Sequence, residues 1–143
     1  QNMIKIELNR LNDAFHFSAE NESGITVHLD SSPDSGGSNQ GMRPMQMLLA
    51  ALGGCSAIDI ITILNKQRQP LNDLKITVTG EREKDAIPSL FKTVHAHYSF
   101  FGNLDHEKVE KAISLSIEKY CSVSQTLEKA GARITYSFEV VAA

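Results

Sequence analysis

Apolar and polar residues alternate along three short segments at the start of the chain. A period of two is typical of strands that pack one face on a core and leave the other face in water. Turn residues separate the segments at Asn12–Asp13 and at Glu22–Gly24, which favours hairpins. We therefore predict three antiparallel strands with the following inward positions: Ile4, Ile6 and Leu8, then Phe15 and Phe17, then Ile25, Val27 and Leu29.

A long apolar segment follows, from Met45 to Leu64, and it has neither a clear alternation nor a polar face. Pro44 suits the first turn of a helix, and Pro70 closes the segment. The length would span a bilayer, but Asp59 lies well inside it, and an acidic residue there costs about 2.5–3.5 kcal/mol on insertion. We therefore predict a long central helix that is buried on all sides in a globular core.

Alternation returns in the second half of the chain and predicts three more strands. Two of them are adjacent in the sequence, and the third lies at the end. Their apolar positions are Leu74, Ile76 and Val78, then Val94, Ala96, Tyr98 and Phe100, then Ile134, Tyr136, Phe138 and Val140.

Two helices are predicted before the last strand. Asp105 is a suitable N-cap for the first, whose apolar residues recur at helical spacing from Val109 onward. Ser122, with Gln125 three residues later, has the form of a capping box that opens the second helix and places Cys121 at its N-terminus. The element order βββ-α-ββ-αα-β indicates an α+β fold with antiparallel sheets, in a single domain over residues 1–143.

Composition agrees with this outline. A chain of 143 residues that is 41% hydrophobic and 22% charged is typical of one globular domain. The net charge of −3, without a block of basic residues, argues against a nucleic acid partner. No charged start precedes an apolar stretch, as export would need, so we expect a cytoplasmic protein without membrane attachment or cofactor. Met3 is expected to be the native start, and Gln1 and Asn2 to be residues added before it.

Cys55 and Cys121 are the only cysteines of the chain. In a reducing compartment such a pair is more often catalytic, redox-sensing or metal-binding than a permanent disulfide. Cys55 follows Gly53 and Gly54, which together cost a helix roughly 2 kcal/mol relative to alanines and so indicate close packing on their side. Cys55 lies nearly opposite that stripe, where it can line a pocket. Its alternative role is that of a small buried hydrophobic residue.

A nucleophilic Cys55 needs a nearby cation, because only the thiolate reacts. The candidate cations are Arg10, Arg43, Arg82 and Arg133. Cys121 stands at a helix N-terminus, which lowers a thiol pKa and suits a resolving sulfur, although it can equally be a packing residue at the helix junction. His95 and His97 share the polar side of a strand. We interpret them as solvent-facing and predict no metal site.

The segments Pro44–Ser56, PMQMLLAALGGCS, and Glu118–Ser122, EKYCS, resemble those of the OsmC/Ohr family of thiol-dependent peroxidases. Within the family the chain is most similar to the YhfA-like branch, through Cys55–Asp59 and Glu118–Ser124. The resemblance covers nearly all of Met3–Ala143. It implies an OsmC-like fold whose subunits form an intertwined homodimer, with the central helices packed together and an active site at each end of the interface.

The resemblance also implies an activity, the reduction of organic hydroperoxides in the oxidative stress response. Cys55 would be oxidised to a sulfenic acid, and Cys121 would resolve it to a disulfide that an external dithiol, such as a lipoyl group, reduces. In the best-studied branches a Glu follows the proline and pairs with an Arg of the first hairpin. Here Met45 holds that position, Gln46 is the nearest polar substitute, and Arg10 is the hairpin arginine. This departure leaves a second hypothesis, non-catalytic binding of a small ligand on the same scaffold.

Overall fold

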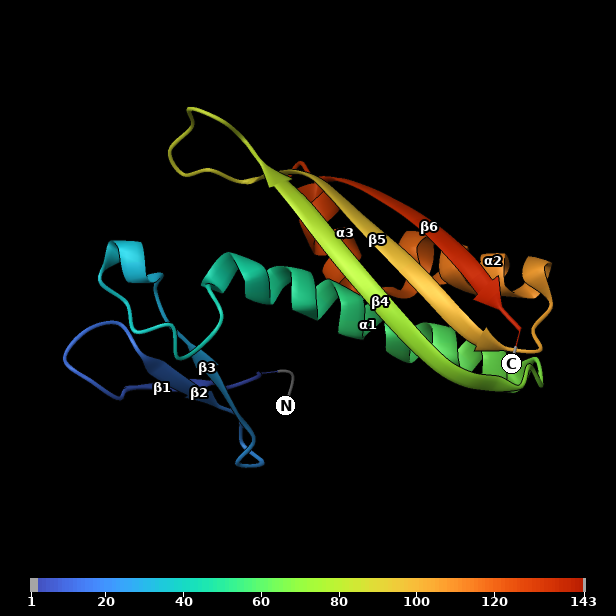
Figure 1. Cartoon of the computed structure of the whole chain (residues 1–143), viewed down its shortest axis with the longest axis horizontal. Helices are drawn as coiled ribbons and strands as arrows, with labels where there is room; N and C mark the ends of the chain where they lie inside the picture. The colour runs from blue at the N-terminus through green and yellow to red at the C-terminus, as the bar shows by residue number, and fades with distance from the viewer. Residues whose placement is uncertain (1–2, 143) are drawn as a thin grey trace. The chain divides into compact units, whose positions relative to one another are not determined.

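The computed structural model describes residues 3–142, so the expectations for Gln1 and Asn2 lie outside the described residues. Contacts within the chain form two compact units, one ending at Met47 and the other beginning at Leu48. The predicted α+β class and the order βββ-α-ββ-αα-β are confirmed (Figure 1). A single domain over residues 1–143 stays a prediction.

The first unit contains a three-stranded antiparallel sheet in the order β1-β2-β3. Leu8 of β1 lies opposite Ala19 of β2, which in turn lies opposite Val27 of β3. β1 begins later than the alternation predicts, because its partner strand turns away after Glu20. The three strands, blue in Figure 1, are β1 (Glu7–Arg10), β2 (Phe17–Glu20) and β3 (Thr26–Leu29).

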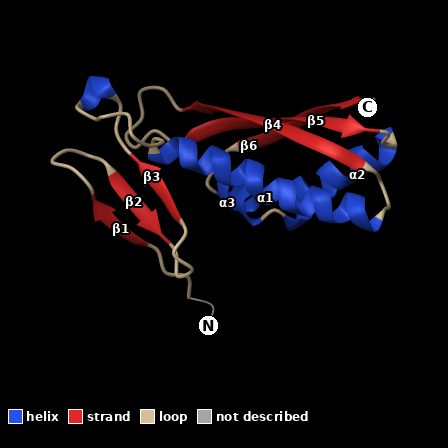
Figure 2. Ribbon diagram, turned by 60° about the horizontal axis from the view of Figure 1, so that its bottom comes forward, coloured by secondary structure: helices blue, strands red, loops and turns tan. Residues whose placement is uncertain are grey.

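The second unit contains a sheet in the order β4-β5-β6, with its helices on one face (Figure 2). β4 and β5 are antiparallel, with Ile76 opposite Tyr98, whereas β6 runs parallel to β5. The prediction of antiparallel sheets is therefore wrong for β6. The helices between β5 and β6 form the crossover that a parallel pair requires. The elements are β4 (Leu71–Arg82), β5 (Phe91–Gly102), α2 (His106–Leu115), α3 (Ser122–Lys129) and β6 (Arg133–Val141).

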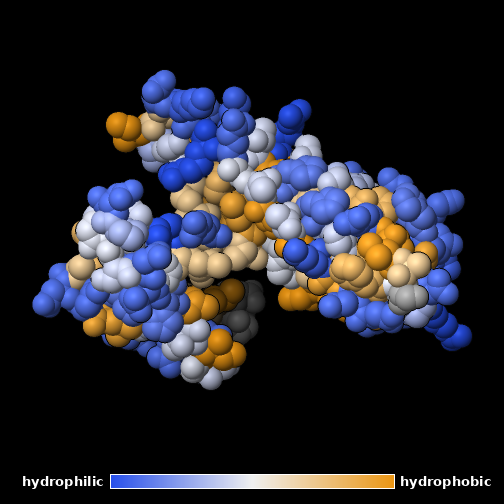
Figure 3. Space-filling model, viewed as in Figure 1, coloured by the Kyte–Doolittle hydropathy of each residue, from blue (hydrophilic) through white to orange (hydrophobic). Residues whose placement is uncertain are grey.

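The long helix α1 (Pro44–Lys66) matches the predicted apolar segment. Its buried residues share one face, and they are Leu52, Gly53, Ser56, Ile60 and Leu64. Leu48, Ile58 and Ile61 of the same helix are exposed, and Figure 3 shows apolar residues at the surface over the first half of the helix. The prediction that α1 is buried on all sides is wrong for one chain, because a single sheet covers only one face of a helix.

By length and composition alone, α1 is long and apolar enough to cross a membrane, the only such helix in residues 3–142. Its Leu52, Ile60 and Leu64 side chains are completely buried. Val94 and Tyr98 of β5 are also completely buried, and Tyr98 Oη donates to Ser56 Oγ of α1 at 2.8 Å. The helix thus forms one layer of a core whose other layer is the sheet.

The paired glycines of α1 differ in their surroundings. A Cβ atom at Gly53 would lie 3.3 Å from Val78 Cγ2 and 3.9 Å from Ile76 Cγ2, so the Val78 side chain on β4 would have to shift by a few tenths of an ångström. At Gly54 no described atom beyond the neighbouring residues and the helix backbone lies within 4 Å of such a Cβ. The predicted close packing therefore accounts for Gly53, and nothing in the structure accounts for Gly54.

His95 and His97 alternate with the buried residues of β5 and so lie on the sheet face away from α1. His95 Nδ1 lies 2.7 Å from Thr135 Oγ1, and His97 Nδ1 lies 2.7 Å from Ser137 Oγ. Both rings are half-buried, because β6 runs in register beside them. The predicted face is correct, but the side chains are bound to β6 rather than free in solvent.

Candidate functional site

Cys55 lies near the middle of α1, and Asp59 follows it one turn later. Residues four apart on a helix point to the same side, and both of these side chains are half-buried. They stand at the edge between the buried and exposed faces of α1. This position gives a thiol and a carboxylate that are held by the core but remain open to small molecules.

Cys121 is held by an unusual turn. After α2, residues Ser116–Tyr120 form the π-helical turn η2, in which the Cys121 N–H donates to the Ser116 carbonyl at 2.7 Å. Such turns insert one extra residue into a helix and occur often at functional sites. The π-helical turn ends at Tyr120, and the backbone of Cys121 is extended. Cys121 itself is completely buried.

The N-cap of α3 is Cys121, so the prediction of a capping box on Ser122 is wrong. Cys121 Sγ accepts the Ser124 N–H at 3.4 Å, and Ser122 is already the first helical residue. The Gln125 side chain instead donates to the Glu118 carbonyl at 3.3 Å. The predicted place of Cys121 at the helix N-terminus is confirmed. The Asp105 cap of α2 is also confirmed, because its carboxylate accepts N–H groups of the first turn.

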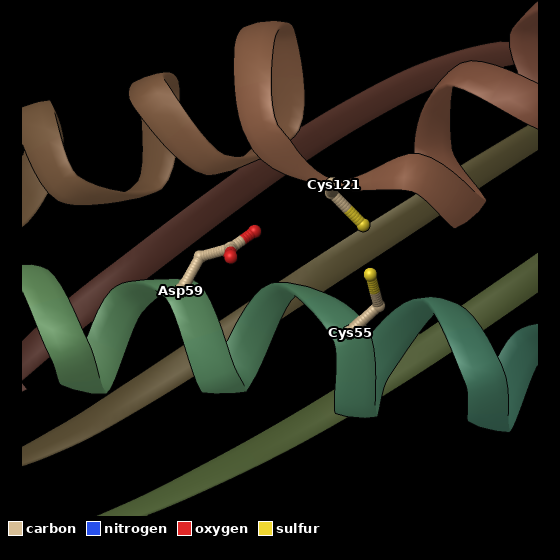
Figure 4. Close-up of side chains that lie close together, drawn as sticks. All are labelled: Cys55, Asp59 and Cys121. Carbon is tan, nitrogen blue, oxygen red and sulfur yellow. The ribbon is translucent and has the colours of Figure 1, made fainter. Parts of the chain in front are cut away.

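The two cysteines and Asp59 meet in the second unit (Figure 4). Both sulfur atoms and one carboxylate oxygen lie within 4.8 Å of one another. The thiols of Cys55 and Cys121 point toward each other, and neither is in a disulfide. A small movement would bring the sulfurs to bonding distance, which is about 2.05 Å.

Burial raises the pKa of the Cys121 thiol to about 11. The Ser124 N–H opposes this shift, and the nearby Cys55 side chain adds to it. The expectation that the helix N-terminus lowers the Cys121 pKa is therefore wrong. Desolvation of the buried thiolate outweighs the backbone N–H groups of Val123 and Ser124, which lower the pKa.

Asp59 was not predicted as a site residue, although its spacing from Cys55 on one helix face was the signal that could have revealed it. Ser116 Oγ donates to Asp59 Oδ2 at 3.0 Å, which orients the carboxylate from the π-helical turn. Asp59 also lines a cavity of about 420 Å³. Its other lining residues are Thr62, Ile63, Lys66, Leu115 and Tyr120. The carboxylate thus faces both the sulfurs and an open space.

A buried hydrogen bond fixes α1 beside Cys55. Tyr98 Oη on β5 donates to Ser56 Oγ at 2.8 Å, and Ser56 Oγ donates to the Gly53 carbonyl at 3.1 Å. Burial raises the pKa of Tyr98 to about 12, so the phenol stays protonated as a donor. Ser56 follows Cys55 directly, so this contact restrains the backbone that carries the thiol.

The predicted activating residues make other hydrogen bonds. Arg82 Nε donates to the Ser89 carbonyl at 3.0 Å in the second unit. Arg10 donates to the carbonyls of Ala14 and Asp13, and Arg43 donates to the Gly41 carbonyl and to Asn39 Oδ1. Gln46 Oε1 accepts the Arg43 N–H at 3.0 Å. Their action on Cys55 stays a prediction.

Known proteins are similar to this chain in sequence and in fold. Residues 37–137 match the model of the family described as OsmC-like protein. Protein YhfA of Escherichia coli K12 is 44% identical over 128 residues, which are 89% of this chain and 91% of that protein.

Two solved structures extend the comparison. A hypothetical protein from Aquifex aeolicus VF5 is 29% identical with a TM-score of 0.84, over 100% of this chain and 99% of that one. An organic hydroperoxide resistance protein OsmC from Legionella pneumophila, described as a predicted redox protein, is 18% identical with a TM-score of 0.71 over 96% of both chains. The second likeness shows the fold alone.

Proposed function

Because this chain belongs to the OsmC-like protein family, we propose that it reduces organic hydroperoxides through Cys55 and Cys121. The observation that carries the proposal is the meeting of the two free thiols, which come from α1 and from the start of α3. Solved relatives of the same fold include organic hydroperoxide resistance proteins, which supports the choice of substrate class. A cytoplasmic location, where dithiols are available, belongs to the same proposal.

The half-buried Cys55 is the peroxidatic residue, because Cys121 is completely buried. The Cys55 thiolate attacks the O–O bond and becomes a sulfenic acid, and the departing alkoxide takes up a proton to leave as an alcohol. Cys121 then attacks that sulfur, which forms the disulfide and releases water. An external dithiol, such as a lipoyl group, returns both cysteines to thiols.

The Cys55 thiolate needs a favourable charge nearby. The sources we propose are Arg10, Arg43 and Arg82, with Gln46 as a polar helper. Arginine keeps its charge at every relevant pH, so it can stabilise a thiolate without a partner of its own. Met45 at the family Glu position leaves such an arginine less firmly held than in the best-studied branches.

The second hypothesis, non-catalytic binding of a small ligand, rests on Met45 and on the cavity beside Asp59. The experiment that separates the two functions is a steady-state assay of the reduced protein with cumene or tert-butyl hydroperoxide and a series of dithiols, including dihydrolipoamide. The peroxidase proposal expects hydroperoxide to disappear in proportion to dithiol oxidised. Inactivity with every dithiol would favour the binding function.

Disulfide formation should accelerate with rising pH. Burial raises the pKa of Cys121 to about 11, so below that pH the attacking thiolate increases roughly tenfold per pH unit. Rapid acid quenching after the sulfenic acid has formed, followed by mass spectrometry, gives the rate of this step. We expect an increase of roughly 100-fold between about pH 7 and 9. A flat profile would show that Cys121 does not attack as a free thiolate.

We also propose that the protein is a homodimer. Ile58 is 70% exposed on α1, and Leu48 and Ile61 are each 39% exposed, although all three are large apolar residues. A second copy that packs against α1 would bury apolar surface of these residues, which is favourable by roughly 25 cal/mol per Å². Light scattering at micromolar concentration should give twice the chain mass of 15.7 kDa. A monomer mass would contradict the dimer, and Ile58→Lys should shift the protein toward that mass.

A further inference from the structure

Cys55, Asp59 and Cys121 also form a set of metal-binding side chains (Figure 4). Their two sulfurs and one carboxylate oxygen lie within 4.8 Å of one another. Thiolate sulfur and carboxylate oxygen are both ligands of zinc in proteins. Zinc enzymes use pairs of ligands that lie four residues apart on one helix, as Cys55 and Asp59 do. The third ligand, Cys121, comes from the start of α3. We propose that the reduced protein binds one Zn²⁺ ion per chain through these three side chains.

The geometry is close to that of a zinc site. Bonds of about 2.3 Å to sulfur and 2.0–2.2 Å to oxygen place the ligands of a tetrahedral ion roughly 3.6–3.8 Å apart. The observed separations exceed this by about an ångström at most, which small side-chain rotations of the half-buried Cys55 and Asp59 can close. The site therefore needs no rearrangement of α1 or η2.

Surrounding groups support the same ion. Ser116 Oγ donates to one oxygen of Asp59, and hydrogen bonds of this kind orient metal-binding carboxylates. Asp59 also lines the cavity of about 420 Å³, from which water can reach the carboxylate. A bound dication also offsets the desolvation of the buried Cys121 thiolate, because a coordinating thiol is deprotonated by the metal.

This inference goes beyond the proposed peroxidase function, because binding requires only reduced thiols. Zinc and oxidation exclude each other at this site. Two thiolates, one hydroperoxide and two protons give a disulfide, an alcohol and water, and a disulfide is no longer a thiolate ligand. The metal is released when Cys55 and Cys121 are oxidised, and bound zinc slows the attack on peroxide. Release of zinc by peroxide rests on the proposed peroxidase function, whereas binding of zinc by the reduced thiols does not.

The test is an anaerobic titration of the reduced, metal-free protein with Co²⁺ alone, followed by Zn²⁺ competition against a chromophoric chelator. We expect one Co²⁺ per chain, a thiolate-to-cobalt charge-transfer band, visible bands typical of a tetrahedral ion, and complete displacement by Zn²⁺. Loss of the band after oxidation to the disulfide is expected as well. Absence of a thiolate band, or of stoichiometric binding, would overturn the site.

Variants identify the ligands. Asp59→Asn should weaken Zn²⁺ binding by at least about tenfold, and Cys55→Ser or Cys121→Ser should remove most of the charge-transfer band. Glu118→Gln is the matched control, because this exposed carboxylate lies three residues before Cys121 but outside the cluster. Unchanged affinity in Asp59→Asn would overturn the three-ligand site. Since the titration contains no peroxide, its outcome is independent of whether the protein proves to be a peroxidase.

Discussion

Cys55→Ser is expected to reduce dithiol-dependent consumption of cumene hydroperoxide to the rate measured without protein. A serine hydroxyl stays protonated near neutral pH, and only a thiolate attacks the O–O bond at a useful rate. Cys121 cannot replace it, because its side chain is completely buried and burial raises its pKa to about 11. The expected loss is therefore complete rather than partial, and it is measured by the hydroperoxide that remains after a fixed time.

Thr126→Ser provides the control for this loss. Thr126 is exposed on α3, where its hydroxyl donates to the Ser122 carbonyl at 2.8 Å, and serine can make the same bond. This variant should keep the wild-type rate. Wild-type rates in Cys55→Ser would remove Cys55 from the mechanism and favour the ligand-binding function.

Cys121→Ser is expected to complete one turnover and then stall. Cys55 is still oxidised to a sulfenic acid, but no second thiol closes the disulfide, so excess peroxide oxidises it further to the sulfinic acid. The serine hydroxyl can still accept the Ser124 N–H, so the cap of α3 is kept. We expect a burst of one alcohol per chain, and intact mass spectrometry should show one and later two added oxygen atoms on Cys55.

Ser124→Ala is the control for the burst. It removes a buried hydroxyl that donates to the Ile117 carbonyl at 3.1 Å, but it leaves both thiols and the Ser124 N–H in place. It should turn over repeatedly even though its free energy of unfolding falls by roughly 1 kcal/mol. Sustained turnover in Cys121→Ser would show that the reductant attacks the sulfenic acid directly, and the resolving role would be withdrawn.

The helices and most strands follow from the sequence because their patterns are local. The mostly apolar segment Met45–Leu64, which lies between Pro44 and Pro70, predicts α1, and alternation predicts β4 and β5. The direction of β6 does not follow, because a parallel and an antiparallel strand show the same alternation. The sequence also does not predict which face of α1 is exposed. The helix is apolar on nearly all sides, so its sequence does not distinguish the face that the rest of the chain covers.

The site was predicted in part. The resemblance to the family motifs predicts that Cys55 and Cys121 act together. Their spacing in the sequence is not itself typical of any redox or metal motif. The π-helical turn at Ser116–Tyr120 has no sequence pattern, because its extra residue is stabilised by surrounding contacts. That turn makes Cys121 the cap instead of Ser122 and places the Ser116 hydroxyl on Asp59. These features depend on tertiary structure, so local reasoning misses them.

Disulfide formation between Cys55 and Cys121 is tested most directly by peptide mapping of the reduced wild-type protein after one equivalent of tert-butyl hydroperoxide, without added dithiol. We expect one disulfide per chain, joining the peptides of Cys55 and Cys121, together with one equivalent of tert-butanol. Cysteines that both remain alkylatable while the hydroperoxide persists unchanged would contradict it.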